Sequence, residues 1–331
     1  MSTTIKEIAK LAKVSIATVS RAYNDSSKVK KNTYNKIIAI AEQLNYSPNL
    51  LAINFVKKKS NIIGLILPDI VDEFFSDIIK GVDEVSYANN YFTMVISSHG
   101  NRSIVESIHN LSSSGIIGGL IILIPNLNED LELVLKKITI PLVIISGTNV
   151  TSQFDTISIN NYQGMYKLVE HLIKKGYKKL ALIEGPQDNN DSIFRKHAFI
   201  DACLENKISL SKDWIAQGDF TLKSGMKACE KLLKLKNRPQ VIVAANDMMA
   251  IGCYEVIKKK KLAIPKQIAV TGFDDIFVAR HLFPPLTTVK TEITELGSQA
   301  TKLIINRLKN NKIKKTKHLL IPTEVVIRKS C

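Results

Sequence analysis

Several features that would place this chain in a particular class of protein are missing from its sequence. The four cysteines (Cys203, Cys229, Cys253, Cys331) show no CxxC spacing, which argues against a disulfide framework or a thiolate metal site. The first residues contain no apolar signal core, and no run reaches 18 apolar residues. We therefore expect a cytoplasmic protein with reduced thiols and no membrane contact.

Sequence motifs of common enzymes are also missing. The six histidines show no HxxxH or HExxH spacing, there is no GxSxG, and residues 115–119 lack both the Walker lysine and the GxGxxG order. Asp274 and Asp275 resemble an acid pair, but neighbouring side chains at a strand end point apart, so turn formation explains them better. We predict no enzyme, no catalytic residue, no metal ion and no cofactor. Turnover of a sugar or nucleotide would revive the enzyme interpretation.

Acidic residues are scarce at the front of the chain. Residues 1–60 hold eleven Lys and Arg against three acids, which is half of the net charge of +16 in under a fifth of the 331 residues. A lysine-rich proteome explains part of the total but not this concentration, which is typical of a protein that binds phosphates. The length indicates two or three domains, and 45% hydrophobic residues suffice for packed cores.

The basic segment begins with two short helical patterns. Ser15 is placed to cap a second helix that runs through Ala22 or Tyr23. Ala9 is small enough to lie where the two helices cross, with Val19 and Ala22 facing that contact, and Lys13 occupies the turn. This spacing predicts a helix-turn-helix, whose second helix lies in the DNA major groove. The first helix presents its apolar residues on one face, at Ile5, Ile8, Ala9 and Ala12.

The outer face of the second helix has side chains suited to DNA. Hydroxyls and Asn24 suit phosphates, Arg21 suits a guanine edge or a phosphate, and Ile16 and Ala17 suit a thymine methyl. The alternative is a plain pair of surface helices with solvated charges. Our candidate DNA-binding residues in this head are Thr4, Ser15, Ile16, Ala17, Thr18, Ser20, Arg21, Asn24 and Lys28.

A third helix and an apolar segment follow. Asn32 or Thr33 is placed to cap a helix through about Leu44, with Ile37, Ile38, Ala41 and Leu44 on its buried face. Residues 50–56 are apolar, flanked by lysines, and too short for a stable isolated helix. Two interpretations stay open: the segment folds on DNA and wedges into the minor groove, or it is a linker that docks on the next domain.

From residue 61 the pattern changes to alternating strands and helices. Two such series predict an α/β core of two doubly wound parallel lobes with a cleft between them, and ligands bind beyond the carboxyl ends of such strands. The predicted strands are 62–67, 92–97, 119–124, 142–146, 180–184, 241–245 and 268–273. One predicted helix ends near residue 89, and the others span 103–113, 128–136, 165–175, 194–206, 224–234 and 249–259.

Polar groups recur at the predicted strand ends. They include Asp69, Ser146, Asn160, Asn246 and Asp274, together with the pairs and runs at 97–98, 160–161, 188–191, 246–247 and 274–275. Taken singly, each is more typical of a cap or turn. Arg195 near the amide-rich loop and the aromatic residues Phe74, Phe75 and Phe220 suit a sugar or a flat ring.

The chain resembles the LacI-type (lactose repressor/GalR) family of bacterial transcription regulators over essentially its whole length. The resemblance implies a three-helix head at residues 1–48, a hinge helix and linker at 49–60, and a two-lobed core at 61–331 like periplasmic sugar-binding proteins. Crossings near Asn160, Thr291 and Leu319 would divide the core into lobe 1 (61–159 and 291–319) and lobe 2 (160–290 and 320–331). The motifs that carry the resemblance lie at 14–21, 46–49, 63–69, 161–164, 245–252, 272–275 and 284–289.

By position, the resemblance assigns base reading to Ile16, Ala17 and Arg21, and the hinge helix to Asn49, Ala52 and Phe55. Phe55 stands where the family usually has a wedging leucine. The effector-contacting positions that the resemblance assigns are Asp69, Phe75, Arg195, Phe220, Asn246 and Asp274. Ser146 and Gly147 replace a frequent Asp-Arg pair, so the usual arginine clamp on a sugar is not expected from that strand.

We therefore predict a homodimeric transcription regulator that binds near-palindromic operator DNA sequence-specifically. Its main predicted role is repression. A small sugar-like effector between the lobes would modulate its DNA affinity, and it would act in the cytoplasm at the nucleoid. A solute-binding protein for transport is the second interpretation. The lysines of 309–317 are either a solvated loop or a surface for a co-regulator protein.

Overall fold

A computed structural model describes residues 4–46, 60–68, 70, 72–98, 103–145, 153–310 and 315–331. Contacts divide the chain into two units, a head within residues 1–61 and a core of residues 62–331. None of the helices in the described ranges has the length and apolar character needed to cross a membrane.

The head consists of α1 (Ile5–Ala12), α2 (Ile16–Asn24), a short 3-10 turn (Ser26–Lys28) and α3 (Lys31–Gln43). The predicted crossing of α1 and α2 is confirmed, since Ala9, Val19 and Ala22 are buried in one cluster. The third helix starts two to three residues earlier than predicted, with Lys30 at the cap position, and Leu44 is exposed rather than buried. The aromatic ring of Tyr34 packs on the cluster instead.

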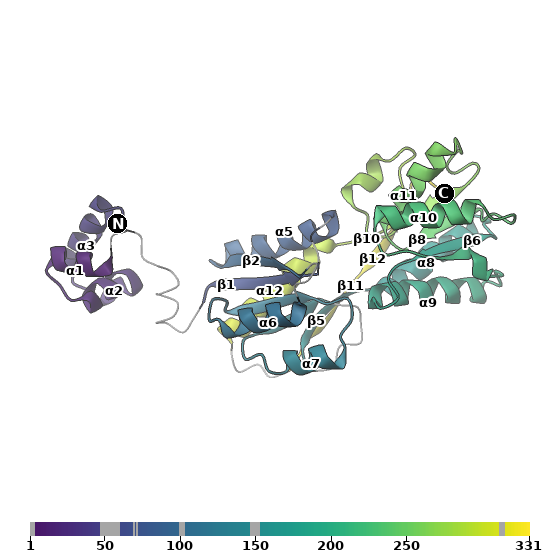
Figure 1. The fold of residues 1–331 in the computed structure, drawn as a ribbon. Helices are drawn as coiled ribbons and strands as arrows, with labels where there is room; N and C mark the ends of the chain where they lie inside the picture. Colours follow the sequence, from purple (N-terminus) through teal and green to yellow (C-terminus); the bar gives the residue numbers. More distant parts are fainter. Residues whose placement is uncertain are drawn as a thin grey trace. The chain divides into compact units, whose positions relative to one another are not determined.

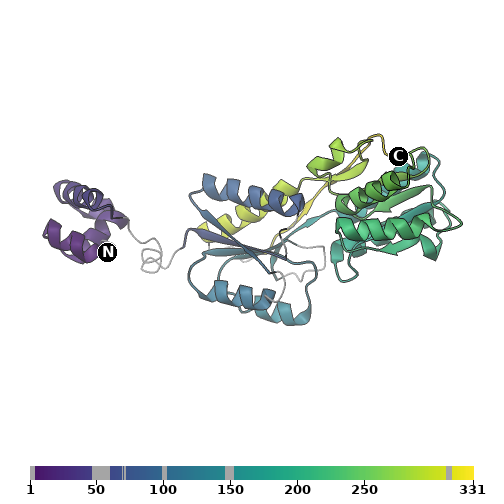
Figure 2. The same ribbon diagram turned by 45° about the horizontal axis from the view of Figure 1, so that its top comes forward.

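The first half of the core is a six-stranded parallel sheet with strand order β11-β5-β4-β3-β1-β2. Figures 1 and 2 show α5 (Glu73–Ala88) and α12 (Ile293–Lys309) on one face, and α6 (Ile104–Ser113) and α7 (Glu129–Leu135) on the other. Alternate residues of one strand accordingly enter different clusters: Leu65 packs with α5, and Ile66 with α6. The strands are β1 (Ile62–Leu67), β2 (Phe92–Ser97), β3 (Gly119–Leu123), β4 (Leu142–Ile145), β5 (Asp155–Ile159) and β11 (His318–Ile321).

The second half contains a four-stranded parallel sheet of order β7-β6-β8-β9. Its strands are β6 (Leu180–Glu184), β7 (Ile215–Gln217), β8 (Val241–Ala244) and β9 (Ala269–Thr271). Its helices are α8 (Asn161–Lys174), α9 (Asn190–Glu205), α10 (Leu222–Leu233) and α11 (Asp247–Lys259), with 3-10 turns at Lys212–Trp214 and Phe277–His281. An antiparallel pair, β10 (Thr288–Thr291) and β12 (Thr323–Val326), completes the core.

The close packing of α5 on α12 depends on two glycines. A Cβ atom on Gly81 would lie 2.0 Å from the carbonyl oxygen of Thr294, and one on Gly297 would lie 2.3 Å from that of Ile78. Both helix backbones therefore approach more closely than any side chain permits. This contact joins the start of the core to its last helix.

The sequence pattern does not predict β5, β7, β10, β12 or α12. β5 lacks the continuous apolar run of β1, because three of its five residues are polar, although all five are buried. The helices α8, α9 and α11 begin two to four residues before their predicted starts. In each, the first residue of a polar pair caps the helix and the second is already helical. The caps are Asn160, Asn189 and Asn246. The predicted crossing at Leu319 falls inside β11, and the chain leaves that strand after Ile321.

Candidate DNA-binding head and effector site

The turn of the head is fixed by local hydrogen bonds. Ser15 caps α2, since its hydroxyl accepts a hydrogen bond from the Thr18 backbone at 3.1 Å and lies 2.8 Å from the Thr18 hydroxyl. Lys13 has φ 56°, a left-handed conformation that usually favours glycine. The turn therefore keeps the geometry of a helix-turn-helix while carrying a long basic side chain.

The outer face of α2 presents three side chains to solvent. Ile16 is 45% exposed, although an isoleucine would normally be buried, and Ala17 and Arg21 are also exposed. Thr18 and Ser20 are half-buried beside them. An apolar residue presented to solvent next to an arginine suits the floor of a major groove.

The remaining predicted DNA-binding residues are placed less uniformly. Thr4 starts α1, where its backbone N–H donates to the Glu7 carboxylate at 2.7 Å. Lys28 is exposed and forms an ion pair with Asp25 at 2.9 Å. The side chain of Asn24 and the whole of Asn49, Ala52 and Phe55 lie outside the described residues.

The core contains a cavity of about 380 Å³ at the carboxyl ends of the strands of both sheets. Three aromatic rings, those of Phe74, Phe75 and Phe220, line it, and the first two pack edge to face with centroids 5.4 Å apart. Arg195, Asn246 and five acids complete its polar wall; the acids are Asp72, Asp188, Asp191, Asp219 and Asp274. Stacking surfaces beside carboxylate and amide groups suit a hydroxyl-rich ring.

Arg195 is the centre of the polar wall. Its side chain is almost fully buried; Nε donates to Asn161 Oδ1 at 2.7 Å, Nη1 to the Ala245 carbonyl at 2.5 Å, and Nη2 to Asp274 Oδ1 at 3.2 Å. The guanidinium also lies over the Phe273 ring, 3.7 Å from its centroid. These contacts fix the orientation of the guanidinium plane before any ligand arrives.

Burial changes the protonation of the carboxyls around Arg195. Removal from water raises the pKa of Asp274 to about 7, although Arg195 lowers it. Burial likewise raises the pKa of Asp191, whose Oδ1 accepts a hydrogen bond from Asn161 at 2.8 Å. Asp274 therefore changes charge near neutral pH.

Two residues of the cavity have a strained backbone. Phe220 has φ 68° and Asp274 has φ 110°, and neither is a glycine. Each such conformation costs about 1–3 kcal/mol and persists only where the surroundings impose it. Asn246 supplies part of that constraint, because its Nδ2 donates to the Phe220 carbonyl at 3.0 Å while its Oδ1 caps α11.

Asp247 supports the other strained residue from behind the cavity. It is fully buried, accepts from the Thr288 hydroxyl at 2.6 Å and accepts from the Ile276 backbone at 3.0 Å. Burial holds the pKa of Asp247 well above its ordinary value. It thus ties the loop after Asp274 to the start of α11.

Two hydrogen bonds join the halves of the core beside the cavity. Glu73 at the start of α5 accepts from the Phe277 backbone N–H at 2.6 Å. The Asn190 backbone N–H at the start of α9 donates to the Pro125 carbonyl at 3.0 Å. Any change in the angle between the two sheets must alter these contacts.

The structure gathers six of the nine predicted effector residues around this cavity: Phe74, Phe75, Arg195, Phe220, Asn246 and Asp274. Asn160 does not line it, because its side chain caps α8 through Gln163. Asp69 and Ser146 lie outside the described residues. The predicted set omitted Asp72, Asp188, Asp191, Asp219 and the positioning residue Asn161, although polar strand ends had already drawn attention to 160–161 and 188–191.

Within the described part of the chain, no group of three or more His, Cys, Asp or Glu residues is arranged to hold a metal ion. The polar side chains at the centre of the site instead satisfy one another.

Comparison with known proteins agrees with this architecture. A family model described as "Bacterial regulatory proteins, lacI family" matches residues 4–49, and one described as "Periplasmic binding protein-like domain" matches residues 169–331. The chain is 33% identical to the "Probable HTH-type transcriptional repressor ExuR" of Bacillus subtilis (strain 168), over 99% of this chain and 98% of that protein. The chain belongs to the LacI family of bacterial transcription regulators.

This LacI-family regulator also has solved structural relatives. It is 27% identical, with a TM-score of 0.89, to the lac repressor dimer bound to operator and the anti-inducer ONPF, covering 100% of this chain and 99% of that one. It is 25% identical, with a TM-score of 0.72, to a LacI family regulator from Enterococcus faecium with bound ribose, covering 81% and 98%. The regulator is thus a sequence-specific DNA-binding protein with an effector-binding core.

Proposed function

We propose that the regulator represses transcription by binding a near-palindromic operator as a homodimer, and that a sugar-like molecule in the cavity changes its operator affinity. The observation that carries this proposal is the cavity of about 380 Å³, whose wall combines side chains from both halves of the core. A ligand that touches both halves binds one relative arrangement of them better than another.

In the head, we assign base contacts to Ile16, Ala17 and Arg21. Exposure of all three on one face of α2 supports this assignment. Phosphate contacts fall to Thr4, Ser15, Thr18, Ser20, Asn24 and Lys28, and contacts in the minor groove to Asn49, Ala52 and Phe55.

In the core, we assign ligand contacts to Asp69, Phe74, Phe75, Ser146, Arg195, Phe220, Asn246 and Asp274, and add Asp72, Asp191 and Asp219. Asn160 acts one step away, because it starts the helix that holds Asn161 against Arg195. Carboxylates accept hydrogen bonds from ring hydroxyls and amides both accept and donate them, while the phenyl rings cover the apolar faces of a sugar. The ribose bound by the Enterococcus faecium relative supports this ligand class.

The coupling runs through the relative position of the two lobes. We propose that lobe 1 comprises 61–159 and 291–321, and lobe 2 the intervening and final residues, with the last crossing at Pro322 in place of Leu319. Ligand-dependent changes at the Glu73–Phe277 and Asn190–Pro125 contacts would accompany the movement. By linkage, the factor by which the ligand changes DNA affinity equals the factor by which DNA changes ligand affinity.

We propose no catalytic role for the cavity, since Arg195, Asn161 and Asp274 are held by one another. The protein would act in the cytoplasm, at the nucleoid. A co-regulator protein remains a prediction for the lysine-rich segment before β11.

Two measurements test the proposal. A thermal-shift screen of neutral sugars should find a ligand that raises the melting temperature of the wild-type protein and fails to do so for Phe220→Ala. Fluorescence anisotropy on an operator selected from a random duplex pool should then show a ligand-dependent change in affinity. Binding of the ligand with no change in operator affinity would refute the coupling between the cavity and the head. Failure to select any duplex from the pool would refute sequence-specific operator binding.

A further inference from the structure

A group of lysines lies at the edge of the six-stranded sheet opposite the effector cavity, where the parallel strands begin. We call Lys137, Lys309, Lys315 and Lys317 the basic edge. They follow α7, end α12 and precede β11, and all four are exposed. Within the described residues, none of the four ammonium groups forms an ion pair, although Lys309 Nζ donates to Asn89 Oδ1 at 3.3 Å; the neighbouring Lys136 pairs with Glu132 at 2.7 Å.

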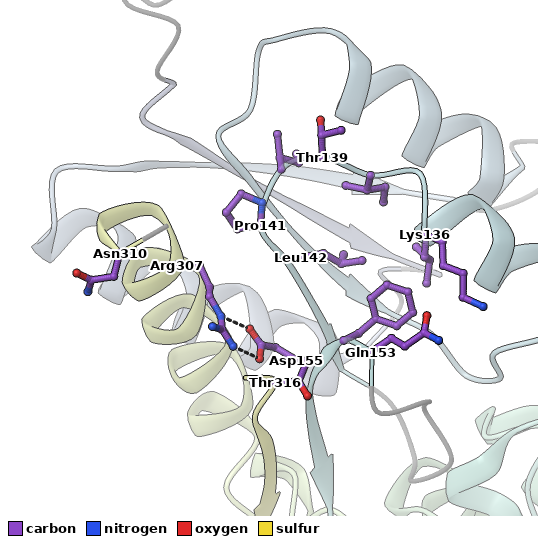
Figure 3. Close-up of a pocket in the computed structure, with 13 residues that line it drawn as sticks. Lys136, Thr139, Pro141, Leu142, Gln153, Asp155, Arg307, Asn310 and Thr316 are labelled. Atoms are coloured by element: carbon purple, nitrogen blue, oxygen red, sulfur yellow. Dashed lines mark hydrogen bonds and ion pairs between the residues drawn. The ribbon is translucent and has the colours of Figure 1, made fainter. Parts of the chain in front are cut away.

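These helix and strand ends surround one hollow of about 560 Å³. Figure 3 shows Lys136, Asn310 and Thr316 around it, with Arg307 and Asp155 on one wall. Asp155 is the single acid of the described lining. The two cations of the lining, Lys136 and Arg307, are each paired with an acid, so the charge available to a partner comes from the four lysines of the basic edge around the hollow.

Asp155 offers little negative charge to an outside cation, because its oxygens are occupied. Arg307 Nε donates to Oδ2 at 2.7 Å and Nη2 to Oδ1 at 2.6 Å, while the Lys317 backbone N–H donates to Oδ1 at 2.7 Å. Arg307 Nη2 also donates to the Lys315 carbonyl at 2.7 Å. The buried pair thus fixes the backbone that carries two lysines of the basic edge.

The chain from the head enters the core at this same edge. β1 begins at Ile62, whose carbonyl accepts from the Gly118 N–H just before β3. Fourteen residue steps separate Tyr46 from Ser60, which reach at most about 50 Å when fully extended. The chain that leads from the head therefore joins the core at the edge where these lysines lie.

We propose that the basic edge is a second, sequence-independent contact with duplex DNA, made to phosphates that flank the site read by the head. Unpaired ammonium groups with one sign of charge bind phosphates by releasing condensed counterions, which requires no base contact. An acidic protein partner is the competing occupant. The inference uses the head's DNA binding but not the identity of the effector.

The test compares two quadruple variants of the full chain. One replaces Lys137, Lys309, Lys315 and Lys317 by Gln. The control replaces the exposed residues Lys258, Lys259, Lys260 and Lys261 by Gln at the end of α11, which removes the same charge from the other half of the core. Circular dichroism and urea midpoints should match the wild type for both.

Binding is measured by anisotropy over a salt series on arbitrary duplexes of about 40 and about 18 base pairs. On the longer duplex, the edge variant should lose about 0.9 from the slope of log K against log salt for each phosphate contact removed, or about 3 to 4 if all four lysines engage. The control should keep the wild-type slope. On the shorter duplex the wild type, the edge variant and the control should give the same slope of log K against log salt.

Equal slopes for edge variant and wild type on the longer duplex would overturn the inference and leave the edge to an acidic protein. Equal losses in edge variant and control would overturn it as well, since they would reflect net charge alone. Failure of every protein, wild type included, to bind duplex at low salt would instead contradict DNA binding by the head.

Discussion

Arg195→Met removes the centre of the effector site while keeping a side chain of similar length. The change deletes three hydrogen bonds and the cation above Phe273, and leaves Asn161 and Asp274 without their buried partner. Asp274 is protonated in a larger fraction of molecules once the cation is gone, because Arg195 lowers its pKa. The remaining cost is the unsatisfied Asn161 and Ala245 groups and the lost packing.

The expected loss is large. Removing one partner of a buried ion pair costs about 3–5 kcal/mol, against a total stability of about 5–15 kcal/mol for a typical domain. With a urea m-value of about 3 kcal/mol/M, the unfolding midpoint of the core should fall by about 1 to 1.7 M. The unfolding midpoint of Arg195→Lys should lie between those of the wild type and Arg195→Met, because an ammonium cannot reproduce three donors in one plane.

The assay is urea unfolding followed by tryptophan fluorescence. Trp214 is the one tryptophan of the chain and is buried in the core, so its emission reports on the core and not on the head. The matched control is Arg280→Met, which removes an exposed arginine that lies 5.5 Å from the Phe277 ring centroid. This control should change the free energy of unfolding by less than about 1 kcal/mol. A loss below about 1 kcal/mol for Arg195→Met, or an equal loss in the control, would refute the reasoning.

Three further predictions concern other parts of the molecule. Arg21→Ala should weaken operator binding by about 1–3 kcal/mol in anisotropy titrations if Arg21 reads a base; an equal loss on random duplex would make it a phosphate contact. For Asp274, a folded pKa of about 7 above an unfolded value near 3.8 means that its stabilising protonation is complete below pH 4 and lost as pH rises through 7. Lowering the pH from 8 to 6 should therefore stabilise the wild type by about 1.4 kcal/mol more than Asp274→Asn, measured by urea unfolding, and identical pH profiles would contradict the shift. Gly81→Ala should destabilise the core by about 1–3 kcal/mol, because its methyl would meet the Thr294 carbonyl. The control Ala88→Gly, at the exposed end of the same helix, should cost less than about 1 kcal/mol. Thermal denaturation of both variants measures the difference.

Patterns that depend on neighbouring residues could be predicted from the sequence. Ser15 and the spacing of Ala9, Val19 and Ala22 located the crossing of α1 and α2, since capping and helical periodicity are local. The apolar run of β1 was equally clear, because a strand covered by helices on both faces is apolar throughout. β5 was not, since its Asp155 becomes acceptable in a buried strand only through Arg307, 152 residues later in the chain.

The residues of the effector site, too, could be predicted only where the pattern is local. Strand ends with polar residues pointed to the correct edge of each sheet, and so to Asn246 and Asp274. Which member of a polar pair faces the cavity depended on the helix start: Asn160 became a cap, and Asn161 became the partner of Arg195. Strain at Phe220 and Asp274 has no sequence signature, because their positive φ values are imposed by contacts with distant segments.

The position of β11 has a consequence for synthesis of the protein. This strand forms the outer edge of the six-stranded sheet beside β5, yet it is synthesised after every other strand of that sheet. The head, by contrast, has its own buried cluster within the first 46 residues. A nascent or prematurely terminated chain that stops before His318 would therefore carry a finished operator-reading module on a body whose sheet is incomplete, and such a fragment would occupy DNA without the means to respond to a metabolite.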